Sequence, residues 1–294
     1  MPAARTASVP PQLYFAVSAV FHYLGPAFAV LLFARVDVLG VAWLRIAVAA
    51  LVFAWWRRPV RTWRGLDGDT RRLLAGWGVV LAAMNACFYL AIDRLPLGTV
   101  AAIEFVPVIG LAAFAARTPR NVAALALAAV GVYLLTAVVL VDDPVGVLLA
   151  AANAVLFCLY IVLGHRVASS GEVAGIDGLA IAMLIAGIVA LPIGVGSALP
   201  ACADPGARAA AAGGGISSSV IPYGCDPRAL ARLPRATYAL MVSLLPATAV
   251  VIGAVVLRQV PTVREAVGVA MVVAAVAVHQ QLAPASESTK ESHA

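Results

Sequence analysis

Ten apolar runs of about membrane-spanning length occupy most of this 294-residue chain. A helix rises about 1.5 Å per residue, so about twenty apolar residues cross the hydrocarbon core of a bilayer. Hydrophobic residues make up 63% of the chain and charged residues only 12%, a composition unlike that of a soluble domain. The pattern predicts an all-α integral membrane protein with ten transmembrane helices, over residues 14–33, 38–56, 73–92, 97–116, 122–141, 144–164, 178–199, 207–229, 236–257 and 263–282.

The eighth run is the weakest of the ten. It contains three consecutive glycines, Gly213–Gly215, so hydropathy alone also allows a re-entrant or broken segment. Positive charge favours a full crossing, because cytoplasmic loops retain arginine and lysine. With ten spans and a cytoplasmic N-terminus, most of the arginines fall in cytoplasmic loops, including the group at Arg57–Arg72. We therefore expect both termini to face the cytoplasm.

A short internal repeat divides the chain into two halves. The tripeptide RLP at residues 94–96 recurs at residues 232–234, and Thr99 and Thr237 follow at the same distance. Each half contains five spans, so the second half enters the membrane in the opposite sense. Inverted repeats of this kind are typical of secondary transporters, whose substrate site lies near the midplane. The expected organisation is a cytoplasmic segment (1–13), two five-helix repeats (14–141 and 144–282) and a disordered cytoplasmic tail (283–294).

Two long stretches resemble a known family. FYLAIDRLPLGTVAAIEFVPV in the first half and SSSVIPYGCDPRALARLPRATYALMVSLLPATAVVIG in the second are similar to the drug/metabolite transporter superfamily with paired EamA-type repeats, and within it to the threonine/homoserine exporter-like branch. The chain departs from the family pattern at Gln259, where a glutamate is usual, and at Pro227, which follows Asp226. The resemblance implies transport of a small-molecule substrate across a lipid bilayer.

Several polar residues lie inside the predicted spans at similar depth. Counted from the outer ends of their spans, Arg45, Glu104 and Asn85 each lie about 10 Å below the membrane edge, and Asn153 lies about 13 Å below it. His22 lies a little deeper. A charge at bilayer depth costs at least ~2.5 kcal/mol, so such residues normally face a bundle interior or a wet cavity. These side chains are therefore candidates for the substrate or coupling site.

Two interpretations of Arg45 and Glu104 stay open. They can form a buried ion pair that joins the second and fourth spans. Alternatively they bind an amphoteric solute, with Arg45 meeting a carboxylate and Glu104 meeting an ammonium or carrying a proton. Asn85 and Tyr89 share a helical face with Gly78, so they can serve either the site or the packing of helices.

Other residues are less specific. His22 could relay protons, but a lone histidine fits a packing residue better. Prolines break helix hydrogen bonds, so Pro107, Pro222 and Pro246 are candidate bending points for alternating access, and equally ordinary kinks. Asp226 is expected at a helix end or in a loop near the cytoplasmic edge.

The sequence contains no motif of a hydrolase, a zinc enzyme or a phosphate-binding loop, so we expect neither an enzyme nor an ATP-driven pump, and no cofactor or metal. The net charge of +6 comes from arginines in connecting segments, which does not indicate nucleic-acid binding.

The leading hypothesis is a secondary transporter in the plasma membrane of a bacterium, exporting threonine, homoserine or related small metabolites, with proton coupling. Two other functions stay open: efflux of hydrophobic or cationic drugs with Glu104 as counter-charge, and a non-transporting receptor or assembly factor. A homodimer is also left open.

Overall fold

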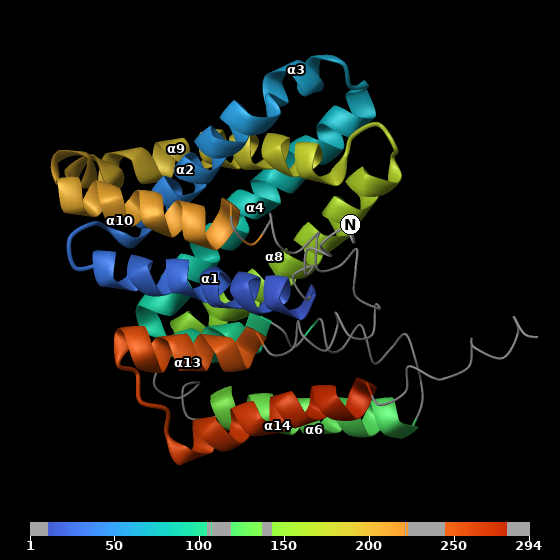
Figure 1. Cartoon of the computed structure of the whole chain (residues 1–294), viewed down its shortest axis with the longest axis vertical. Helices are drawn as coiled ribbons and strands as arrows, with labels where there is room; N and C mark the ends of the chain where they lie inside the picture. Colours follow the sequence, from blue (N-terminus) through green and yellow to red (C-terminus); the bar gives the residue numbers. More distant parts are fainter. Residues whose placement is uncertain are drawn as a thin grey trace, which may run out of the picture.

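The computed structural model describes residues 11–104, 107, 119–136, 143–220, 222 and 245–280, and these residues are helical apart from the short connections. The predicted tail, the second copy of the RLP repeat and Asp226 lie outside the described residues. The helices are α1 (Pro11–Leu32), α2 (Val38–Arg57), α3 (Pro59–Arg64), α4 (Gly68–Arg94), α6 (Pro119–Thr136), α8 (Pro144–Ser169), α9 (Gly175–Ala203), α10 (Pro205–Gly215), the π-helical η1 (Ile216–Val220), α13 (Leu245–Leu257) and α14 (Val263–Gln280) (Figure 1). Residues 97–104 form one further helical segment.

Five of these helices are long and apolar enough to cross a membrane: α1, α2, α4, α8 and α9. They correspond to the first, second, third, sixth and seventh predicted spans. The structure therefore confirms the helical fold class and gives five helices with the length and hydropathy of membrane spans. These helices extend a few residues beyond several of the predicted apolar runs. The eighth run begins as the α-helix α10 and changes at Ile216 to the wider π-helix η1.

Aspartate side chains start four of the helices. Asp37, Asp67, Asp143 and Asp204 each accept a hydrogen bond from a backbone amide in the first turn that follows, at 2.6–3.0 Å. These bonds satisfy amides that have no partner within the helix. Proline follows the aspartate at the start of α8 and α10, where its missing N–H costs nothing.

The last helix, α14, starts differently. Thr262 and Glu265 form a capping box: the Glu265 carboxylate accepts the Thr262 amide at 2.7 Å, and the Thr262 hydroxyl accepts the Glu265 amide at 3.2 Å.

The connection between α13 and α14 contacts the first half of the chain. Arg258 takes up a left-handed backbone conformation with φ 57°. The Gln259 side chain then reaches back, and its Oε1 accepts the amide of Leu97 at 3.2 Å. Gln259 therefore caps the helical segment that begins at residue 97 and carries Glu104. The glutamine that departs from the family pattern is a structural residue in this chain.

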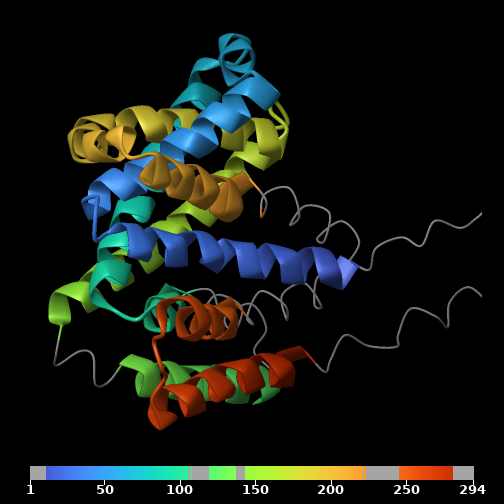
Figure 2. The same cartoon turned by 60° about the vertical axis from the view of Figure 1, so that its left-hand side comes forward.

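The helices of the two halves interleave. α2 packs along α9, and α4 packs along both α8 and α9. α1 lies between α10 and α13, and α6 and α14 lie side by side at the opposite end of the molecule from α3 (Figures 1 and 2).

Glycines allow the closest of these approaches. A Cβ on Gly78 of α4 would lie 2.6 Å from the Ile185 Cβ of α9, and a Cβ on Gly40 would lie 2.7 Å from the Ser197 backbone. Gly78 is therefore a packing residue. For this position, the structure favours helix packing over a place in the substrate site.

Candidate functional site

Arg45 on α2 is the centre of a polar cluster made by three helical elements. Its Nη1 donates a hydrogen bond to Asn85 Oδ1 on α4 at 2.6 Å, and its Nε donates to Ser218 Oγ on η1 at 2.8 Å. The guanidinium also lies 5.6 Å from the centre of the Tyr89 ring, in cation–π range. The contact between Arg45 and Asn85 agrees with the sequence analysis, which placed both residues at the same depth in the membrane.

Each partner of Arg45 is itself fixed. Asn85 is buried and donates its Nδ2 to the Ala42 carbonyl at 3.0 Å, which leaves its Oδ1 turned to Arg45. The Ser218 hydroxyl donates to the Gly214 carbonyl at 2.6 Å and accepts from Arg45. Gly25 of α1 packs directly on Ser218, and a Cβ there would overlap the serine. The arginine is therefore held in one orientation by bonds to neutral groups.

A small cavity lies beside this cluster. Arg45 and Tyr89 line one part of it, and Ala211, Gly214 and Gly215 line another. The small residues of α10 thus leave space next to the guanidinium.

Glu104 belongs to a second cluster. Its Oε1 accepts the Nδ2 of Asn153 on α8 at 3.1 Å. Glu104 is 7% exposed and Asn153 is 0% exposed, so both side chains are enclosed by the bundle. Tyr23 of α1 is buried beside them, close enough for its phenol to interact electrostatically with the Glu104 carboxylate.

Arg45 and Glu104 do not pair with each other. The ion pairs among the described residues join other side chains, and none brings Arg45 within 4.0 Å of Glu104. The interpretation as a buried ion pair between the second and fourth spans is therefore wrong for this conformation. The two charges occupy separate clusters.

The remaining predicted residues have varied environments. His22 is half-buried, with its ring edge-on to Tyr23 at 5.0 Å between centroids. Pro107 is half-buried, whereas Pro222 and Pro246 are buried. Pro222 follows η1 closely, and Pro246 is the second described residue of α13.

Sequence reasoning missed Tyr23 and Ser218. Ser218 lies in a run of three serines after three glycines, a polar and small-residue stretch that could have marked a close helix contact. Nothing in the sequence separates Tyr23 from any other tyrosine in an apolar span.

Within the described ranges, no group of three or more histidine, cysteine, aspartate or glutamate side chains is placed to hold a metal ion.

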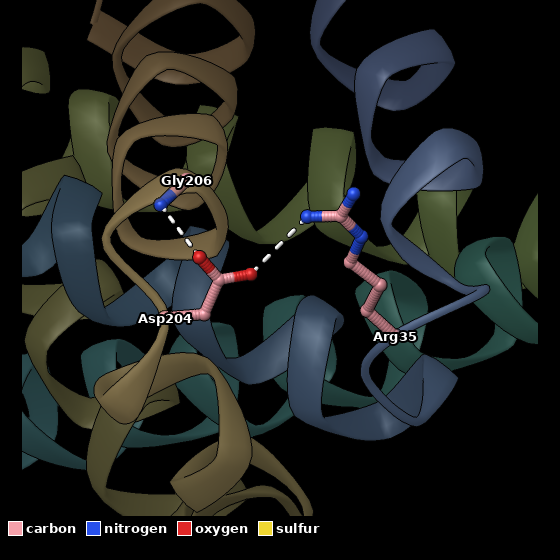
Figure 3. A network of polar contacts seen from close by, with 3 residues as sticks. All are labelled: Arg35, Asp204 and Gly206. Carbon is pink, nitrogen blue, oxygen red and sulfur yellow. Dashed lines mark hydrogen bonds and ion pairs between the residues drawn. The ribbon is translucent and has the colours of Figure 1, made fainter.

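Ion pairs also join the helix ends. Arg35 in the connection between α1 and α2 lies 3.2 Å from Asp204, the residue that caps α10 (Figure 3). Arg94 at the end of α4 lies 3.4 Å from Asp143, which caps α8. Arg57 at the end of α2 lies 2.6 Å from Asp177 in the first turn of α9.

A bundle of membrane-length helices that encloses a fixed cation and a separate carboxyl group has the form of a membrane transport protein. The model of the EamA-like transporter family matches residues 144–279. Relatives named threonine/homoserine exporter RhtA are 32% identical in Escherichia coli K12 and 31% identical in Salmonella typhimurium SL1344, each over 255 residues that cover 85% of this chain and 84% of the relative.

A solved crystal structure shares the fold, with a TM-score of 0.62 over 94% of this chain and 100% of that chain at 18% identity. The chain belongs to the EamA-like transporter family, within the drug/metabolite transporter superfamily and its threonine/homoserine exporter-like branch. It is a multi-pass membrane protein related to exporters.

Proposed function

We propose that this protein is a secondary active transporter that exports amino acids, threonine and homoserine among them, by alternating access. One observation carries the proposal: the half-buried Arg45 and the buried Glu104 lie in two separate polar clusters, each with neutral partners. An amino acid carries a carboxylate and an ammonium at neutral pH, so one solute can meet both charges. The name of the relatives supports the same class of substrate.

Arg45 is suited to receive the solute carboxylate. A guanidinium has five N–H donors in a planar fork. The bonds to Asn85 and Ser218 use two of them, and the Tyr89 hydroxyl lies close enough to the guanidinium to interact with a third. The adjacent cavity has a volume of about 10 Å³, which is space for about one water molecule beside the guanidinium. A charge-assisted hydrogen bond there would be stronger than a neutral one.

Glu104 is suited to receive the ammonium, or to carry a proton when the solute is absent. A carboxyl group enclosed by the bundle can change its exposure from one membrane face to the other while it is the neutral acid or is paired with a cation. This alternation is the basis on which we propose proton coupling. The half-buried His22 lies near both clusters but is not required by this scheme.

Helix contacts support the two inverted repeats. In the proposed arrangement each helix has a counterpart five spans away, so α4 corresponds to α10 and α9 corresponds to α2. If the two repeats are equivalent, the contact of α4 with α9 predicts a contact of α10 with α2. The contact of α4 with α8 likewise predicts a contact of α10 with α1. All four contacts occur. The family match to residues 144–279 lies within the proposed second repeat.

Ion pairs support the proposed topology, in which both termini face the cytoplasm of a bacterial cell. A pair of this length can join only loops at the same membrane surface. Arg35–Asp204 and Arg94–Asp143 each join two loops that are proposed to lie outside the cell. Arg57–Asp177 joins two loops that are proposed to lie inside.

The π-helix η1 and the prolines offer bending points for alternating access. π-Helical turns interrupt the regular hydrogen bonds of a helix and are frequent at functional sites. η1 carries Ser218 and is followed closely by Pro222. A change in η1 would therefore move a partner of Arg45. Pro107 and Pro246 also lie in helical backbone, and we propose that the helix can bend at these two prolines as well.

The test is counterflow of labelled threonine and homoserine in proteoliposomes with and without a proton gradient. Because Glu104 is not the counter-ion of Arg45, Glu104→Gln should insert and fold normally yet lose the stimulation by the gradient. Arg45→Gln should lower exchange itself, by at least about tenfold for one lost charge-assisted bond.

Failure of the wild-type protein to move any amino acid would overturn the proposal. Movement of lipophilic cations instead would favour the drug-efflux alternative.

A further inference from the structure

Two polar atoms next to Glu104 are buried without a hydrogen-bond partner in the part of the chain that the structure describes: the hydroxyl of Tyr23 and Oδ1 of Asn153. Both side chains are 0% exposed. Buried polar groups are almost always hydrogen-bonded, because a group that has lost its water and gained no other partner costs free energy. These two atoms are therefore candidates for contact with a ligand.

The two atoms belong to one region. Asn153 donates to Glu104 at 3.1 Å. Tyr23 packs in the same buried cluster as Ile103, which precedes Glu104, and Ala154, which follows Asn153. Tyr23 and Glu104 are also within electrostatic range of each other. Three helical elements thus bring a phenol, an amide oxygen and a carboxyl group to one buried place.

The chemistry of these groups selects a hydroxyl. The Asn153 Nδ2 donates to the carboxyl group, so the unpartnered atom is the carbonyl oxygen, which can only accept. The phenol of Tyr23 can donate. A hydroxyl group donates one hydrogen bond and accepts others, so it offers the donor that the Asn153 oxygen lacks and the acceptor that the Tyr23 hydroxyl lacks. A methyl group can satisfy neither.

We propose that Tyr23 and Asn153 bind the side-chain hydroxyl of the exported amino acid, next to Glu104, and that Tyr23 determines selectivity for hydroxylated solutes. The inference rests on the proposed function and adds the part of the site that recognises the side chain. A site with buried polar groups rejects the analogue that lacks the matching hydroxyl, because those groups then stay unpaired.

The experiment compares threonine and homoserine with 2-aminobutyrate, which is the deoxy analogue of both. The three labelled solutes are offered to proteoliposomes containing the wild-type protein or Tyr23→Phe. We expect the wild-type protein to prefer the hydroxylated solutes. In Tyr23→Phe the ratio of threonine to 2-aminobutyrate export should fall about tenfold, the effect of one hydrogen bond.

Tyr133→Phe is the matched control. It removes the same hydroxyl from a tyrosine that is 63% exposed on α6, and the ratio should stay at the wild-type value. The folded yield and the thermal midpoint of Tyr23→Phe in detergent should equal those of the wild-type protein, because the lost hydroxyl makes no bond in the described structure.

An unchanged ratio in Tyr23→Phe, with amino-acid export intact, would overturn the inference and leave the proposed function standing; water alone would then occupy the two polar atoms. Loss of folded Tyr23→Phe protein would also overturn it, since the hydroxyl would then have a structural bond. If the wild-type protein exports none of the three solutes, the proposed function itself fails.

Discussion

Arg45 keeps its charge inside the bundle without a carboxylate partner among the described residues. Removing a guanidinium from water is costly unless hydrogen bonds replace the water, and an unpaired buried charge is costlier still. Asn85, Ser218 and the Tyr89 ring offset part of this cost. Packing alone would be better served by a leucine, so the arginine supports the proposed binding of a solute carboxylate at this position.

A cap residue gives a prediction that depends on pH. Asp143 accepts the Gly146 amide and lies beside Arg94, and these contacts lower the pKa of its carboxyl below the ordinary 3.8. Its stabilising effect is complete above pH 3.8 and is lost as the pH falls through the lower pKa of the folded state. Asp143→Ala should therefore lower the thermal midpoint in detergent at neutral pH, and its difference from the wild-type protein should shrink in acid.

Asp143→Asn is the control for that experiment, because asparagine still caps a helix but cannot pair with Arg94. Its midpoint should lie between those of the other two proteins. A difference that stays constant down to about pH 3 would contradict the role of the ionised carboxylate.

At the scale of single helices, the approach of α4 to α9 depends on one missing side chain. A Cβ on Gly78 would lie 2.6 Å from the Ile185 Cβ and 2.9 Å from the Ala182 carbonyl oxygen. Since the obstructing atoms are close to the backbone of α9, the two helices would have to separate. Gly78→Ala should destabilise the protein by about 1–3 kcal/mol, the usual cost of overpacking.

Gly76→Ala tests the same change on the same helix where a Cβ would meet nothing within 4 Å. It should be neutral or stabilise by about 0.5–1 kcal/mol, since alanine favours helix. Equal thermal midpoints for the two variants would show that the contact with Ile185 does not limit the packing.

Helix positions were predictable because apolar length and hydropathy depend on local sequence alone. The depth of Arg45 and Asn85 followed from counting residues, and their hydrogen bond agrees with it. Counting cannot show which sides of two helices face each other, so the sequence left the pairing of Arg45 with Glu104 open, and the structure excludes an ion pair in this conformation. The proposed role of Tyr23 depends on contacts between distant segments, which no local pattern records.

At the scale of the whole molecule, orientation in the membrane can be tested with single cysteines. Gly65 lies in the connection between α3 and α4, and a Cβ there would meet only the Thr62 carbonyl oxygen at 3.6 Å. After replacement of the four native cysteines by alanine, Gly65→Cys should resist a membrane-impermeant thiol reagent in intact cells and react after lysis. Ala34→Cys, exposed between α1 and α2, should react in intact cells.

The reverse labelling pattern would invert the proposed orientation and leave the helix arrangement unchanged.

The hydrogen bond from the Leu97 amide to Gln259 also restricts how often the chain crosses the bilayer. Two groups 3.2 Å apart must lie at the same membrane surface, so the chain between them passes through the bilayer an even number of times. Between residues 97 and 259 the sequence offers six apolar runs, and without the eighth run only five would remain. Parity therefore favours a complete crossing by the segment that contains α10 and η1, the one run whose hydropathy left its path open.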